Sequence, residues 1–167
     1  MNQNAVLKEK ANWHPVWTIR KYANDEAFAQ DKPFEVSRID GNLLLNEGIG
    51  ALLDLLCGLG SPTAFSNANA RIGVGDSSTA AAATQTGLQA TTNKVYKGME
   101  ATYPSRSNQT VTFRAVFGSA EANFSWNEFT VVNGANDDAV NLNRLVSAQG
   151  TKASGQTWTV DVAITLS

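Results

Sequence analysis

The sequence contains little of the chemistry on which most enzymes and metal sites depend. It has one cysteine and one histidine in 167 residues. The single thiol, Cys57, excludes an internal disulfide and a zinc site built from several cysteines. Because it lies within the apolar run LLDLLCGLG, we interpret it as a small buried side chain. His14 lies in a segment without a core pattern, so a serine nucleophile would have no well-placed base.

Charge is also scarce. Charged residues make up 17% of the chain, and 13 Lys and Arg against 15 Asp and Glu give a net charge of −2. No half of the chain is strongly basic, so nucleic acid is not an expected partner. The N-terminus is polar and no apolar run approaches the length of a membrane span, so neither a secretory signal nor a membrane partner is expected.

Catalytic motifs are missing as well. The sequence has no HExxH, no paired CxxC and no GxSxG, and the glycine-rich stretch GVGDSS lacks the lysine of a phosphate-binding loop. We interpret Glu128 as an outward carboxylate at a bulge, and Asp137 and Asp138 as turn residues. The sequence therefore predicts no catalytic residue, no cofactor and no metal site.

What the chain does contain is a two-residue periodicity. The last eleven residues, TWTVDVAITLS, alternate between two faces and carry β-branched residues on both. Shorter alternations over 71–75, 94–101, 110–119 and 140–146 are separated by turn-rich segments. This spacing predicts an all-β fold, a β-sandwich or jelly-roll-like domain over residues 41–167.

Residues 41–60 contain the one convincing helical pattern, which we place near residues 42–57. Its leucines form a broad apolar stripe, and Gly58 or Gly60 would end the helix. A helix this apolar is expected to be a short buried plug packed against the sheet.

Residues 1–40 differ from the rest, because large aromatic side chains are spread among charges without a core pattern. Such side chains usually dock onto something else, so we predict an extended N-terminal arm with edge-strand elements at 16–22 and 34–40. Alternatively, each aromatic could fold back onto the chain's own sheet. The candidate partner-binding anchors are Trp13, Trp17, Tyr22, Phe28 and Phe34.

Three segments together resemble a known group of proteins. They are ARIGVGDSSTAA…TQTGLQA (70–90), TVTFRAVFGSAEANFSWNEFTVVNG (110–134) and LNRLVSAQGTKASGQTWTVDVAITLS (142–167). The chain from 41 to 167 resembles small β-sandwich virion proteins of tailed bacteriophages, which serve as capsid cement or decoration proteins or as tail-associated components. The resemblance implies a non-enzymatic virion structural protein and does not fix its position in the virion; the capsid surface is the leading expectation.

The leading expectation is a capsid cement protein whose arm clamps neighbouring subunits of the major capsid protein. It is expected to be a homo-oligomer, with a trimer as one possible form. One alternative is a tail- or fibre-associated structural protein that uses the sandwich for trimerisation or receptor contact. Another is a carbohydrate-binding module that uses Trp126 or Trp158 as a sugar platform, although Trp158 shares the apolar face of the last strand and is expected in the core.

Overall fold

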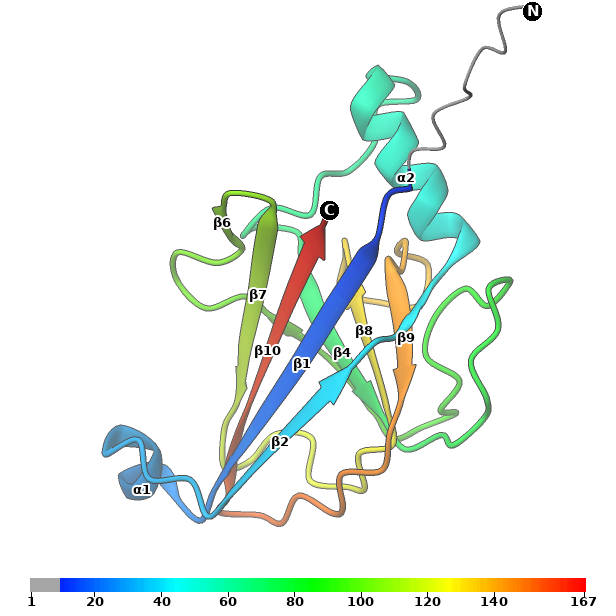
Figure 1. Cartoon of the computed structure of the whole chain (residues 1–167). Coiled ribbons are helices and arrows are strands. Elements are labelled where there is room, and N and C mark those ends of the chain that lie inside the picture. The colour runs from blue at the N-terminus through cyan, green and yellow to red at the C-terminus, as the bar shows by residue number, and fades with distance from the viewer. Residues whose placement is uncertain (1–9) are drawn as a thin grey trace, which may run out of the picture.

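The computed structural model describes residues 10–167, which form two five-stranded antiparallel sheets packed face to face (Figure 1). Strands make up 39% of the described residues and helices 11%, which confirms the predicted all-β sandwich. We name the two sheets after one strand in each, the β1 sheet and the β8 sheet.

The β1 sheet contains, in spatial order, β2 (Glu35–Asp40), β1 (Trp13–Tyr22), β10 (Thr157–Leu166), β7 (Thr110–Phe117) and β6 (Ser105–Ser107). The β8 sheet contains β3 (Leu43–Leu44), β9 (Asn143–Val146), β8 (Glu128–Val132), β4 (Arg71–Gly75) and β5 (Lys94–Gly98). A short helix, α1 (Asp25–Ala29), connects β1 to β2, and α2 (Asn46–Cys57) connects β3 to β4.

The N-terminal segment is a strand inside the β1 sheet. Along its whole length β1 pairs with β10, from Trp13 opposite Leu166 to Tyr22 opposite Thr157, and β2 pairs along its other edge. The strand elements predicted at 16–22 and 34–40 are present as β1 and β2, with β2 at the sheet edge and β1 inside the sheet. The prediction that residues 13–40 extend away from the domain as an arm is therefore wrong, and residues 1–9 lie outside the described part. The physical reason is β10 itself, since a ten-residue strand needs a partner of equal length and β1 supplies it. The division at residue 41 falls inside one sandwich.

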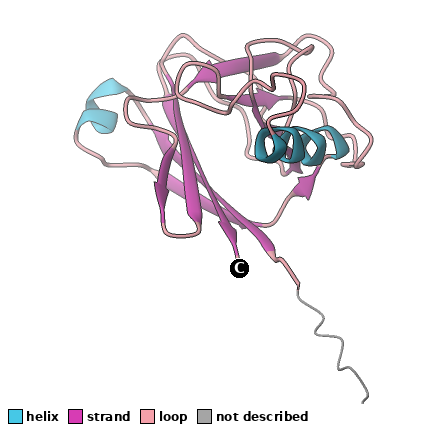
Figure 2. Ribbon diagram, turned by 90° about the horizontal axis from the view of Figure 1, so that it is seen from above, coloured by secondary structure: helices cyan, strands magenta, loops and turns pink. Residues whose placement is uncertain are grey.

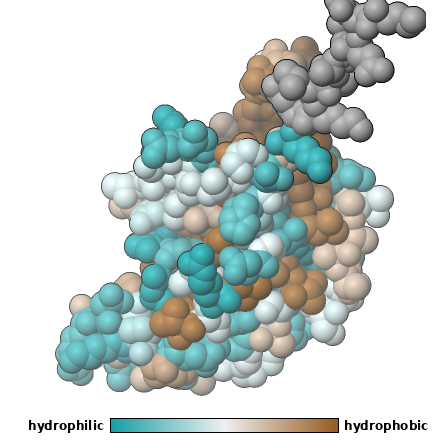
Figure 3. Space-filling view, viewed as in Figure 1, coloured by the Kyte–Doolittle hydropathy of each residue, from teal (hydrophilic) through white to brown (hydrophobic). Residues whose placement is uncertain are grey.

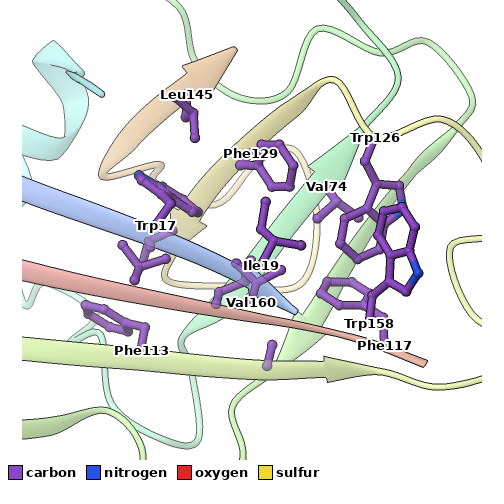
Figure 4. Close-up of a cluster of buried hydrophobic side chains, with 14 of the residues drawn as sticks. Trp17, Ile19, Val74, Phe113, Phe117, Trp126, Phe129, Leu145, Trp158 and Val160 are labelled. Carbon is purple, nitrogen blue, oxygen red and sulfur yellow. The ribbon is translucent and has the colours of Figure 1, made fainter. Parts of the chain in front are cut away.

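Aromatic side chains from both sheets interlock in the core (Figure 4). Trp126 is in edge contact with Phe117, Trp158 and Phe129, with ring centroids 4.8, 4.9 and 6.0 Å apart. Trp17 from β1 lies 5.9 Å from the ring of Phe129 on β8. Contacts of this kind contribute beyond the area that they bury, so the two sheets are held together by rings from both ends of the chain.

The predicted helix is present, but the prediction that it is buried is wrong. α2 begins at Asn46 and ends at Cys57, with Gly58 in the left-handed conformation at its C-cap, as expected. Only Gly48 and Ala51 are buried. A Cβ on Gly48 would overlap the backbone of Leu142, so glycine is what lets the helix approach the residue just before β9. α2 rests on the sandwich by this small contact and projects from one end of it (Figure 1).

No helix in residues 10–167 has the length and apolar character that crossing a bilayer requires.

We predict that Trp17→Ala lowers the free energy of unfolding by about 3–5 kcal/mol, because it leaves a large cavity between the sheets. The matched control is Phe34→Ala, whose side chain is 55% exposed and whose loss should change stability by less than about 0.5 kcal/mol. Urea denaturation followed by circular dichroism measures both. Equal effects of the two substitutions would contradict the placement of Trp17 in the core.

Candidate functional site

The five predicted anchors do not form one surface. Trp17 and Tyr22 are buried within this chain, at 0% and 2% exposure, so the prediction that they bind a partner is wrong. Trp13 is half-buried and donates its indole N–H to Asn42 Oδ1 at 3.2 Å. Phe28 packs edge-on against Tyr22, with centroids 5.2 Å apart. Only Phe34 remains as a mostly exposed ring.

The two proposed sugar platforms are also inside the protein. Trp126 is fully buried and donates its indole N–H to the carbonyl of Ala122 at 2.9 Å. Trp158 is 2% exposed, as its place on the apolar face of the last strand predicted. Neither ring can stack on a saccharide in this structure.

Glu128 is a buried carboxylate, so its interpretation as an outward side chain at a bulge is wrong. Both Glu128 and Arg144 are completely shielded from solvent, and Arg144 Nη2 donates to Glu128 Oε2 at 2.7 Å. The same carboxylate accepts backbone N–H bonds from Gln89 and Ala90 at 2.9 and 2.7 Å. The loop between β4 and β5 therefore covers the outer face of the β8 sheet, which the sequence pattern did not reveal.

Local sequence makes room for this carboxylate. A Cβ on Gly75 would lie 2.5 Å from Glu128 Oε1, so the glycines of the GVG stretch serve packing. Because the carboxylate already accepts four hydrogen bonds and is closed to water, we assign it a structural role. It holds the 76–92 loop on the sheet.

The most unusual surface of the molecule is the solvent-facing side of α2, which we call the α2 face (Figure 3). Its side chains repeat at helical spacing and continue just past the C-cap. They are Ile49, Leu52, Leu53, Leu56 and Leu59, with exposures of 41, 37, 55, 81 and 61%. Cys57 adjoins them and is exposed, so its prediction as a buried side chain is wrong. A contiguous aliphatic surface of this kind is typical of an interaction site.

A shallow groove of about 380 Å³ runs beside the α2 face, between the helix and the loop around 133–140. Asp54 and Asp138 both line it, and neither forms a salt bridge with any other described residue. α2 itself carries no basic residue. The groove is therefore acidic, next to an aliphatic surface.

A second hollow, of about 500 Å³, lies on the outer face of the β1 sheet between α1 and β7, and we call it the outer pocket. At its floor Asp161 accepts hydrogen bonds from Arg20 at 2.5 Å and from Arg114 at 2.5 and 2.8 Å. Tyr22 Oη donates to Asp31 Oδ1 at 2.8 Å. This arrangement fixes two guanidinium groups at one site.

Sequence reasoning missed both surfaces, although α2 gave a usable signal. Its apolar residues cover more of the helix than one buried face can hold, which favours a helix that is buried all round or one with an apolar exposed side. The outer pocket gave no local signal, because its residues come from four separate segments.

The described residues hold no group of three or more His, Cys, Asp or Glu side chains arranged to bind a metal ion. Comparison of the chain with protein-family models, with curated proteins and with solved structures finds no match in any of the three.

We predict that Arg144→Met destabilises the fold by about 3–5 kcal/mol, because it leaves the Glu128 carboxylate buried without its cation. Arg38→Met is the matched control, since Arg38 is exposed and lies 3.9 Å from Asp40, and exposed pairs contribute about 0–1 kcal/mol. Thermal and urea denaturation measure both variants. If Arg144→Met were no more harmful than the control, the pair would not anchor the loop.

Burial and the hydrogen bond to Asp31 raise the pKa of Tyr22 from 10.0 to about 12. The folded state thus holds this proton more tightly than the unfolded state, and the resulting stability is present below pH 10 and lost as pH rises through about 12. Subtracting the alkaline absorbance titration of Tyr22→Phe from that of the wild type should reveal a phenol with a pKa near 12. A difference curve centred near 10 would mean that Tyr22 is open to water.

Proposed function

We propose that this protein is a structural component of a tailed-phage virion, a capsid cement protein that binds the major capsid protein through the α2 face. The resemblance of residues 41–167 to small β-sandwich virion proteins supports this assignment. The observation that carries it is the α2 face, where five aliphatic side chains remain exposed on a folded domain. Attachment through α2 thus differs from the mechanism expected from the sequence, in which an N-terminal arm clamps neighbouring capsid subunits.

The chemistry of this surface defines the partner that it fits. Covering a leucine side chain fully contributes about 1.5–3 kcal/mol, so several together can support binding. The neighbouring Asp54 and Asp138 favour a partner that presents an apolar patch flanked by Lys or Arg. A second copy of the chain fits less well, because pairing α2 with α2 would bring acidic residues together without a compensating cation.

A repeated lattice would strengthen modest contacts. Many copies on one shell, each touching neighbouring capsid subunits, would resist expansion or loss of any single subunit. The capsid surface is therefore the proposed location. A homo-oligomer stays a prediction, which sedimentation of the purified protein tests directly.

The experiment compares binding of purified protein to expanded empty heads of the phage that encodes it. Leu53→Gln/Leu56→Gln should reduce binding at least tenfold and remove the added resistance of the heads to heat, while leaving the fold intact because both side chains are exposed. Phe34→Gln is the matched control, since it also removes an exposed apolar side chain but far from α2.

Cys57 provides a second measurement, because it is the only thiol and adjoins the α2 face. Its alkylation should be fast in free protein and slow on heads. Full binding by the leucine variant, or loss of binding in Phe34→Gln alone, would contradict the proposal. Binding to purified tails and not to heads would favour the tail-associated alternative. Self-association through the α2 face would mean that its partner is a second copy of the chain and not the capsid protein.

A further inference from the structure

The outer pocket is a separate candidate for binding, remote from the α2 face. Figures 1 and 2 show α1, which borders the pocket, far from α2 on the sandwich. Its volume of about 500 Å³ lies within the range of small-molecule sites. The charged and aromatic side chains in its lining include Arg20, Arg114, Asp31, Glu100, Phe28 and Tyr103.

The lining carries charges of both signs, and with Asp161 beneath it the site has three carboxylates and two guanidinium groups. Two arginines face two carboxylates, those of Asp31 and Glu100, while Asp161 below binds both guanidinium groups. An anionic ligand would meet the two carboxylates, and a cationic ligand would meet the two arginines. A neutral ligand meets no like charge of either sign.

Several polar atoms in the pocket have capacity left for a ligand. Within residues 10–167, the Glu100 carboxylate accepts no hydrogen bond, and Asp31 uses only Oδ1. Arg20 donates from a single nitrogen, Nη1, to Asp161. Guanidinium groups only donate and carboxylates only accept, so the pocket offers both functions side by side. A ligand rich in hydroxyl groups, each of which donates and accepts, matches this alternation.

Aromatic rings supply the apolar part of the lining. The Arg114 guanidinium lies 4.9 Å from the ring centroid of Tyr103, which holds that ring at the pocket. Phe28 is 37% exposed and is braced by Tyr22, while Tyr22 itself is closed to solvent. Exposed parts of Phe28 and Tyr103 can contact the C–H face of a sugar ring, whose rim carries hydroxyls.

We propose that the outer pocket binds a neutral saccharide. Arg20, Arg114, Asp31 and Glu100 would hydrogen-bond its hydroxyls, and Phe28 and Tyr103 would pack on its ring. This site differs from the predicted platforms Trp126 and Trp158, which are buried, and it does not depend on the capsid role of the α2 face.

The test titrates ¹⁵N-labelled protein with glucose, galactose, mannose and N-acetylglucosamine, each separately, and follows amide shifts by NMR. At least one sugar should produce saturable shifts confined to α1, the adjoining parts of β1, β7 and β10, and the residues around Tyr103, with a Kd on the order of millimolar. Sodium phosphate and lysine serve as charged probes and should bind more weakly than that sugar.

Glu100→Gln is the first variant, because the Glu100 side chain makes no hydrogen bond within the described chain and its replacement should not disturb the fold. Arg20→Gln is the second, with Arg38→Gln as the matched control on the neighbouring strand β2. The first two should weaken sugar binding about tenfold, as expected for hydrogen bonds to charged groups, and the control should leave it unchanged.

Absence of saturable shifts with all four sugars would overturn the proposal. So would shifts that map to another surface, tighter binding of phosphate or lysine, or binding that neither pocket variant weakens. None of these results bears on head binding through the α2 face, so the two proposals fail separately.

Discussion

The pairing of β1 with β10 is the contact on which the rest of the structure depends. It joins the first strand of the described chain to the last over ten residues, and β2 and β7 pair on its two sides. Both strands place aromatic side chains in the core, Trp17 from one and Trp158 from the other. Because backbone groups on β1 are paired along both edges, this segment cannot detach to bind a partner without opening the sheet. A segment that binds a partner by leaving the domain must therefore be sought elsewhere.

The distribution of polar and apolar groups indicates where a binding surface lies. Charged side chains inside the protein have polar partners: Glu128 pairs with Arg144, and Lys152 donates to the carbonyl of Gly118 at 2.8 Å and to Asn123 Oδ1 at 2.7 Å. Burial lowers the pKa of Lys152, so these two hydrogen bonds support a cation that would otherwise be costly. The exposed leucines of α2 are unfavourable in a different way, because their apolar surface is in contact with water in the isolated chain. A partner that covers this surface would remove that cost.

The α2 face and the outer pocket differ in chemistry as well as in position. One is aliphatic with an acidic margin, which fits the proposed protein partner. The other has charges of both signs and partly exposed rings, which fits the proposed hydroxyl-rich ligand. The rigid sandwich between them separates the two sites. A protein built this way could attach by one end and bind a ligand on another face, with no conformational coupling required.

Periodicity in the sequence was sufficient for the fold class, for the last strand as a core element and for a helix near 42–57 that stops at Gly58 or Gly60, because these follow from local alternation and capping. The role of residues 13–40 was not readable in the same way, since alternation cannot say which strand a segment pairs with. Tertiary structure alone decided that Trp17 and Tyr22 are core, that Glu128 is buried beneath the 76–92 loop, and that the leucines of α2 face solvent. Burial depends on what covers a face, and the covering segments here lie tens of residues away in the chain.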